Sequence, residues 1–123
     1  MQLGLTAKTT MVVSADDTAV AARSGDVPVL STPRIVALCE EAAVAAVAGQ
    51  LAKGETTVSM RVQLDHLAPS PIGSTVTASA KLEKVEGRRL KFSVSVNDDR
   101  GLVAAGKVTR VVVERDRFLE KCV

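Results

Sequence analysis

Four stretches with strand-like alternation fill the second half of the sequence, and they restrict the possible fold more than any other feature. Apolar and polar residues alternate along each stretch, as expected for a strand with one buried face. The stretches are Thr56–Leu67, Thr75–Val85, Leu90–Asp98 and Leu102–Glu114. The last three are separated by Glu86-Gly87-Arg88 and Asp99-Arg100-Gly101, which are short enough for antiparallel hairpins. Residues 68–73 cannot continue a strand, because two prolines remove donors from the ladder.

A single long helix is predicted before these strands. Thr32 precedes Pro33, and a hydroxyl N-cap followed by proline is a favourable helix start. An alanine-rich stretch then continues to about Lys53, and Gly54 supplies the stop. Because so many side chains between residues 37 and 52 are alanine, the helix is slim enough to lie close against a sheet.

The remaining segments complete an α+β fold. Residues 2–13 predict a further strand, and residues 14–31 predict a loop over the core with a short helical turn. Ordered loops of this length are often lids or binding loops. Residues 115–123 predict a last helical turn. One helix with a run of antiparallel strands predicts that the sheet covers the helix, and the length of 123 residues suits a single domain over residues 1–123.

The composition argues against nucleic-acid and membrane binding. Phe92 and Phe118 are the only aromatic residues, so successive bases have no stacking platform. The net charge of +2 comes from scattered residues and gives no basic stripe for a phosphate backbone. No apolar run is long enough to span a bilayer, and the N-terminal segment lacks the pattern of a secretory signal. We therefore expect a cytoplasmic protein.

The cysteine and histidine content argues against a metal centre. Cys39 and Cys122 lie far apart in the sequence, and we expect both thiols to be reduced. His66 is the only histidine. One imidazole and two distant thiols do not make a metal-binding cluster, so we expect neither a metal nor another cofactor.

Two ionisable side chains are predicted on apolar faces. On a helical wheel Glu40 falls within an apolar stripe, whereas Glu41 points to the opposite, solvated side. The stripe contains Val36, Val44, Val47 and Leu51. On the following strand, His66 shares one face with apolar residues at a period of two. These residues are Val58, Met60, Val62 and Leu64.

A carboxylate and an imidazole would then meet in a largely dry environment. Buried charges persist when they are paired or used, so a Glu40–His66 pair indicates a site in which the carboxylate orients the imidazole or activates water. The structural alternative is that His66 caps its strand and Glu40 binds a backbone amide. We favour the functional interpretation because the two groups occur together and a helix-start hydroxyl precedes Glu40 in the sequence.

Thr32 is the third candidate. As an N-cap it would satisfy free amides, and its hydroxyl would also lie at the positive end of the helix, where an oxyanion is stabilised. Thr32 and Glu40 are separated by about 12 Å along a regular helix axis. The site is therefore either elongated or completed by a second subunit.

At this point the sequence resembles the hotdog-fold thioesterases, specifically the fluoroacetyl-CoA thioesterase-like family. The motifs that carry the resemblance are Ser31-Thr32-Pro33, Glu40-Glu41-Ala42-Ala43, the run from Asp65-His66 to Ile72-Gly73, and the run from Gly106 to Val113. The resemblance implies that Thr32, Glu40 and His66 are catalytic, and that Arg110 and Ser31 bind substrate. It also implies a long central helix wrapped by an antiparallel sheet, and a homodimer with sites along the interface.

Pairing of dimers into a dimer of dimers is left open by the sequence. The resemblance further implies an acyl-CoA substrate and no metal or organic cofactor. The family's fluoroacetyl-specific enzyme gates its pocket with a lid phenylalanine, but residues 14–31 here contain no aromatic side chain. We therefore expect a different small or medium acyl group.

Hydrolysis of an acyl thioester is the predicted reaction. His66 would act as general base or acid, Glu40 would orient it or serve as the base, and Thr32 would be a nucleophile or a hydrogen-bond donor. The donor role is favoured for Thr32, because its hydroxyl attacks only beside a base. The alternatives are a non-catalytic acyl- or CoA-binding hotdog protein, a dehydratase, and a purely structural dimer.

Overall fold

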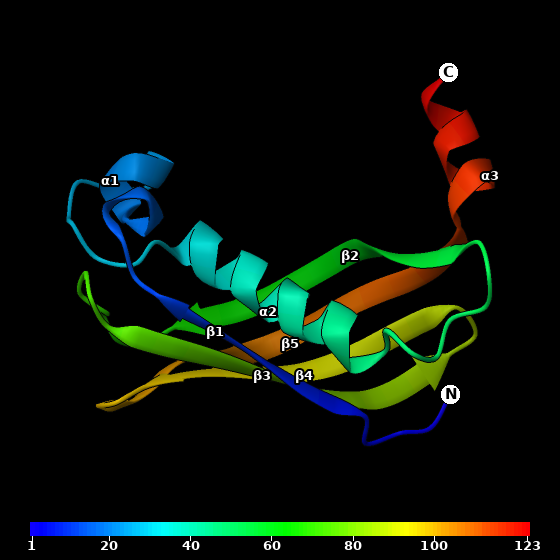
Figure 1. The fold of residues 1–123 in the computed structure, drawn as a ribbon, viewed down its shortest axis with the longest axis horizontal. Coiled ribbons are helices and arrows are strands. Elements are labelled where there is room, and N and C mark those ends of the chain that lie inside the picture. Colours follow the sequence, from blue (N-terminus) through cyan, green and yellow to red (C-terminus); the bar gives the residue numbers. More distant parts are fainter.

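The computed structural model describes residues 1–123 and consists of one curled antiparallel sheet around one long helix (Figure 1). The sheet order is β1-β3-β4-β5-β2, so β1 and β2 are its edges. Its strands are β1 (Thr6–Val12), β2 (Glu55–His66), β3 (Thr75–Glu86), β4 (Arg89–Asp98) and β5 (Gly101–Glu114). The long helix is α2 (Thr32–Ala46), and the short helices are η1 (Ala15–Asp17), α1 (Ala19–Ala22), α3 (Arg115–Leu119) and η2 (Glu120–Cys122).

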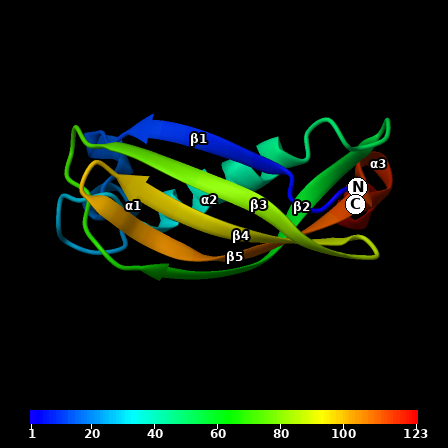
Figure 2. The same cartoon turned by 90° about the horizontal axis from the view of Figure 1, so that it is seen from below.

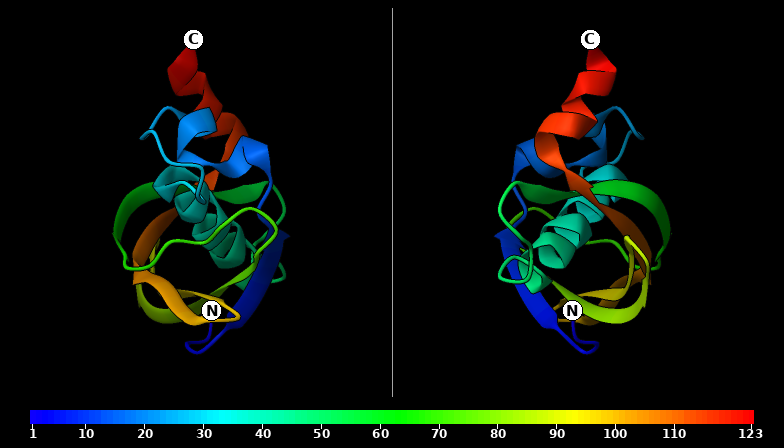
Figure 3. Two further views of the ribbon diagram at one scale, coloured as in Figure 1. Left: turned by 90° about the vertical axis from the view of Figure 1, so that its left-hand side faces the viewer. Right: turned by 90° about the vertical axis from the view of Figure 1, so that its right-hand side faces the viewer.

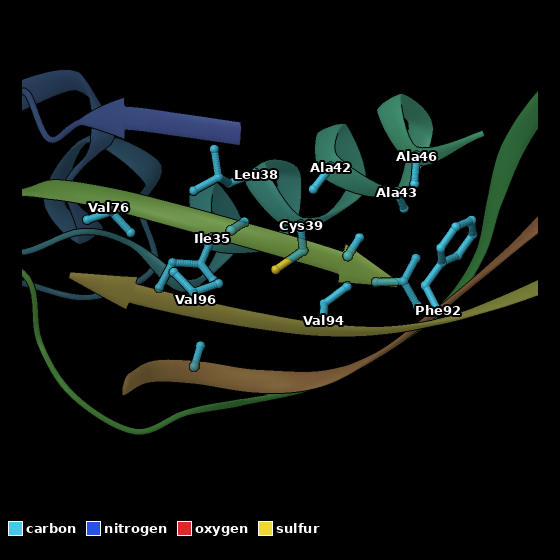
Figure 4. Close-up of a cluster of buried hydrophobic side chains, with 14 of the residues drawn as sticks. Ile35, Leu38, Cys39, Ala42, Ala43, Ala46, Val76, Phe92, Val94 and Val96 are labelled. Atoms are coloured by element: carbon cyan, nitrogen blue, oxygen red, sulfur yellow. The ribbon is translucent and has the colours of Figure 1, made fainter. Parts of the chain in front are cut away.

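The concave face of the sheet covers α2, which confirms the predicted α+β arrangement. Figure 2 shows the strands in front of the helix, and the end views of Figure 3 show the sheet curving around it. The buried face of α2 packs on β1, β3 and β4. Figure 4 shows this core, in which the small alanine side chains of α2 face the larger Phe92 and the valines of the strands. No helix is long and apolar enough to cross a membrane.

The four later strands agree with their predicted bounds to within one residue. The first strand is shorter than the predicted residues 2–13, since Gly4 has a positive φ of 88° and turns the chain before β1 begins. The predicted loop over residues 14–31 contains η1 and α1 and closes on itself through a bridge between Thr18 and Leu30. The predicted C-terminal helical turn is confirmed by α3 and η2.

The helix begins and ends earlier than predicted. Ser31, not Thr32, is the N-cap, because its extended backbone allows Oγ to accept a hydrogen bond from the Arg34 amide at 3.1 Å. Thr32 is thus the first helical residue. The helix ends at Ala46 rather than near Lys53. After it the chain forms tighter turns, in which backbone amides donate hydrogen bonds to carbonyls three residues earlier.

The predicted apolar stripe of the helix was only partly correct, since Val47 is buried and Leu51 packs against the core, whereas the centre of the stripe lies elsewhere. The residues that face the sheet are Ile35, Leu38, Cys39, Ala42, Ala43 and Ala46. Val44, which was expected in the stripe with Glu40, is 43% exposed. The helix carries valine and alanine on several sides, and the small alanines are what allow close contact with the sheet. Glu40 lies half-buried at the border of the true stripe, while Glu41 is exposed as predicted.

Gly106 permits the close contact between β5 and β2. It pairs with Leu64 on β2, two residues before His66. A Cβ atom added at Gly106 would overlap the carbonyl oxygen of Gln63 and crowd the Leu64 backbone. The absence of a side chain at this position therefore fixes the path of the strand that ends at His66.

Replacing Gly106 with Ala is expected to lower the free energy of unfolding by about 3 kcal/mol, because the backbone of β2 must move to admit the methyl group. Urea unfolding would measure the change. Gly49→Ala is the matched control, since an added Cβ there meets no atom within 4 Å. Equal stability of the two variants would contradict the packing argument.

Candidate active site

The Thr32 hydroxyl and the His66 imidazole form the first half of the candidate site. Thr32 Oγ1 lies 2.7 Å from His66 Nδ1, although the residues are 34 positions apart in sequence. Thr32 begins α2 and His66 ends β2, so the contact joins the start of the helix to the end of an edge strand. The other ring nitrogen of His66, Nε2, is buried and has no hydrogen-bond partner.

Backbone contacts hold each member of this pair. His66 pairs with Ala104 on β5, and the two amides that follow it, of Leu67 and Ala68, both donate to the Val103 carbonyl. On the helix side the Ser31 amide donates to the Asp17 carbonyl at 2.9 Å, which ties the helix start to η1. The pair is therefore positioned by the sheet and by the loop over the core.

A shallow cavity of about 230 Å³ opens beside His66. It is lined by Val29, His66, Leu67, Ala68 and Pro69. Apart from the imidazole its lining is aliphatic, so the cavity suits a small apolar group.

The start of α2 also presents a free backbone donor. Pro33 has no amide hydrogen, and the Arg34 amide is used by the Ser31 cap. The Thr32 amide has no acceptor within the protein. This donor lies at the positive end of a 15-residue helix, where negative charge on a bound oxygen is stabilised.

Glu40 and Arg110 form the second half of the candidate site. Arg110 Nη1 donates to Glu40 Oε1 at 3.0 Å, and its Nε and Nη2 donate to the hydroxyl and the carbonyl of Thr57 at 3.0 and 2.9 Å. Burial lowers the pKa of Arg110, whereas the charge of Glu40 raises it. The guanidinium nevertheless stays ionised, because its ordinary pKa is so high. The result is a carboxylate held in one orientation by a nearly buried cation.

The expected pairing of Glu40 with His66 is corrected by this arrangement. His66 contacts Thr32, and Glu40 contacts Arg110. Thr32 and Glu40 are eight positions apart, which is more than two helical turns, so each side chain contacts a different partner. The structure brings the predicted residues together as two pairs rather than as one cluster.

Ser31 and Thr57 make contacts within the protein that the sequence did not indicate. Ser31 is buried, and its hydroxyl is occupied by the helix cap. Thr57 was not predicted as a site residue, yet it is buried and receives two bonds from Arg110. The sequence did not indicate Thr57 because β2 has a bulge between Ser59 and Arg61. Before the bulge the odd-numbered Thr57 faces inward, and after it the even-numbered residues up to His66 do so.

Because of the same bulge, part of the predicted apolar face of β2 was wrong. Val62 and Leu64 pack partly against the core on the side of His66, as expected. Met60 lies within the bulge and is 49% exposed, although it was predicted on that face. A bulge changes the phase of the alternation, and nothing in the local sequence marks its position.

The two cysteines lie in different environments and are unpaired. Cys39 is fully buried in the core, and Cys122 is exposed near the C-terminus. Burial, aided by the neighbouring charge of Glu40, raises the pKa of Cys39 to about 11. Its thiol is therefore protonated at neutral pH and is no candidate for the nucleophile.

In a thiol titration with an aromatic disulfide reagent at pH 8, the folded protein is expected to react once and rapidly, at Cys122. Cys39 is shielded and protonated, so it should react only after unfolding in guanidinium chloride. Cys122→Ser should abolish the rapid phase. Rapid modification of two thiols in the folded protein would show that the Cys39 region is open.

Most of the chain is similar in sequence to fluoroacetyl-CoA thioesterases. The family model for fluoroacetyl-CoA-specific thioesterase matches residues 13–116. The fluoroacetyl-CoA thioesterase of Streptantibioticus cattleyicolor is 38% identical over 93 residues, which are 76% of this chain and 67% of that protein.

Solved structures of the same kind superpose closely. A structure of the fluoroacetyl-CoA thioesterase FlK has a TM-score of 0.93 at 31% identity, covering 99% of this chain and 95% of its own. A hot-dog-like protein from Thermanaerovibrio acidaminovorans has a TM-score of 0.90 at 30% identity, covering 98% and 89%. The predicted hotdog fold is thereby confirmed.

Proposed function

The chain belongs to the fluoroacetyl-CoA-specific thioesterase family, and from that premise we propose that Thr32, Glu40 and His66 are its catalytic residues. Membership makes the protein an acyl-CoA thioesterase, which hydrolyses an acyl thioester to the free acid and CoA. We further propose that residues 1–123 form one catalytic domain, since a single core joins the helix to β3, β4 and β5, and partly buried residues of β1 and β2 pack against it. The observation that carries the site assignment is the 2.7 Å contact between Thr32 Oγ1 and His66 Nδ1.

Thr32 acts as the nucleophile in this proposal. The sequence favoured a donor role because a threonine hydroxyl needs an adjacent base, and His66 Nδ1 lies where such a base must be. His66 takes the hydroxyl proton as Oγ1 attacks the thioester carbonyl. The tetrahedral oxyanion is bound by the free Thr32 amide. Collapse of the intermediate expels the CoA thiolate, which receives the proton from His66.

Water then hydrolyses the Thr32 ester and regenerates the hydroxyl. We assign activation of this water to Glu40, because Arg110 holds its carboxylate in one orientation while 24% of the side chain stays accessible. Arg110 contributes mainly by positioning Glu40, since three of its donors are already bonded within the protein. Its remaining donors can bind a substrate oxygen.

A small or medium acyl group suits the cavity beside His66. The aliphatic lining is formed largely by Val29, Ala68 and Pro69, and the cavity volume is about 230 Å³. The loop over residues 14–31 contributes no aromatic gate. A purely acyl-binding role is less well supported, because binding alone would not require the contact between a hydroxyl and an imidazole.

We propose that the protein is a cytoplasmic homodimer formed along β2. This strand is an unpaired edge of the sheet, and Met60 on it is half exposed. Leu67, directly after the strand, and Val44 on α2 are exposed as well. Exposed apolar side chains beside a free strand edge are typical of a surface that another sheet covers. Because Thr32 and Glu40 of one subunit lie more than two helical turns apart, we propose that the dimer brings Glu40 within reach of the water that attacks the ester of the other subunit.

The site assignment is tested by thiol release from a panel of acyl-CoA thioesters, from acetyl to octanoyl. His66→Ala and Thr32→Val are each expected to lower kcat about 10²- to 10⁴-fold, because general base and nucleophile are lost. Glu40→Gln should also lower kcat strongly. Nearly full turnover in a folded His66→Ala variant would contradict the catalytic role of His66.

Glu41→Gln is the matched control for Glu40→Gln. The two residues are neighbours on α2, but Glu41 is exposed and contacts only Arg34 on the surface. Its replacement should leave kcat within about twofold. Equal losses in the two variants would refute the distinct role of Glu40.

The dimer is tested by light scattering during size-exclusion chromatography. Met60→Arg should shift the mass from two subunits to one, because a charge is placed in the proposed interface. Val12→Arg is the control, since Val12 is an exposed apolar residue on the other edge strand, β1. A wild-type protein that is monomeric at micromolar concentration would contradict the proposal.

A further inference from the structure

Ser70 is a fully buried polar residue within the loop that follows His66. Its hydroxyl donates to Asp98 Oδ2 at 3.0 Å. Asp98 ends β4, and only 3% of its side chain is exposed. The second oxygen of the same carboxylate accepts the Arg100 amide at 2.8 Å, within the turn between β4 and β5. The proposed chemistry uses neither residue.

The backbone of Ser70 contacts the segment that leads into the helix. Its carbonyl accepts the Leu30 amide at 2.9 Å, and Val29 forms a bridge with Pro71. Leu30 is buried and lies two residues before Thr32. Ser70 therefore contacts the chain leading to Thr32 through its carbonyl and the β4–β5 turn through its hydroxyl.

The loop that carries Ser70 begins directly after His66. Its first two amides are bonded to Val103, but Pro69 and Pro71 contribute no amide donors to hold its remainder. The Leu30 amide on the Ser70 carbonyl and the Gly73 amide on the Val13 carbonyl hold part of this remainder, and side-chain contacts add further restraint. The contact between Ser70 and Asp98 is such a restraint, and burial makes it costly to leave unmade.

We infer that Ser70 and Asp98 are positioning residues that set the contact between Thr32 and His66. This inference rests on the proposed catalytic roles of that pair. The carboxylate of Asp98 fixes Ser70 relative to the sheet, and the Ser70 carbonyl then fixes the approach of the chain to the start of α2. A hydrogen bond of 2.7 Å weakens when its atoms move apart by a few tenths of an ångström.

The experiment combines steady-state kinetics with a spectroscopic measurement on His66. Ser70→Ala should lower kcat about 10- to 100-fold, since a misplaced nucleophile and base react slowly. KM should change by less than about threefold, because the residue does not touch substrate. The acyl-CoA used is the member of the panel that the wild-type protein hydrolyses fastest.

His66 is the only histidine, so ¹⁵N labelling of histidine gives the resonances of one imidazole. In Ser70→Ala the Nδ1 resonance should move toward its position in Thr32→Val, in which the hydroxyl is absent. This measurement needs no turnover. If the wild-type protein hydrolysed no acyl-CoA, the proposed function would fail while the positioning role could still be tested.

Ser74→Ala is the matched control, because the Ser74 hydroxyl is buried close by but has no hydrogen-bond partner. It should leave kcat and the Nδ1 resonance unchanged. Asp98→Asn should retain most of kcat, since an amide can still accept from Arg100 and donate to Ser70. Asp98→Ala should behave like Ser70→Ala, and this pair carries the test if Ser70→Ala does not fold.

Three outcomes would overturn the inference. The first is a folded Ser70→Ala or Asp98→Ala variant with wild-type kcat. The second is a loss of kcat with an unchanged Nδ1 resonance. The third is an equal loss in Ser74→Ala, which would show that any hydroxyl removed from this loop has the same effect.

Discussion

Close packing of an alanine-bearing helix face inside a curled sheet is the constraint on which the other features depend. Ala42, Ala43 and Ala46 add little volume, so α2 can lie near the strands while Phe92 and the strand valines fill the core. This packing fixes the helix both axially and in rotation. The rotation leaves Glu40 at the border of the core, and the axial position brings Thr32 to the end of β2.

The two polar pairs occupy different surroundings, and this difference separates their roles. Thr32 is exposed, and its hydroxyl is hydrogen-bonded to the imidazole of His66. The second ring nitrogen of His66 has no hydrogen-bond partner. Arg110 is nearly buried and is bonded to Glu40 and to Thr57. Removal of either partner of a buried charge pair leaves the other without compensation. The second pair is therefore part of the fold as well as of the proposed chemistry.

The positions of the strands could be predicted from the sequence much better than the buried face of the helix or the contacts between distant side chains. Alternation with a period of two is imposed by the pleat, so the later strands were located to within one residue. The helix face was misjudged because valine and alanine occur on several sides of α2. The bulge at Ser59 leaves no local trace, and the contact of Arg110 with Glu40 joins residues 70 positions apart. Such a pairing depends on sheet order, which a single sequence does not contain.

His66 ends a strand that is hydrogen-bonded along one side only. Strand ends at a sheet edge open more readily than central strands, because fewer bonds and contacts must be broken at once. Local fraying of β2 would separate His66 from Thr32 without unfolding the core. Amide hydrogens near His66 should then exchange with solvent faster than those of β4. A subunit docked on β2 would slow this exchange, so assembly and the integrity of the site would be thermodynamically linked.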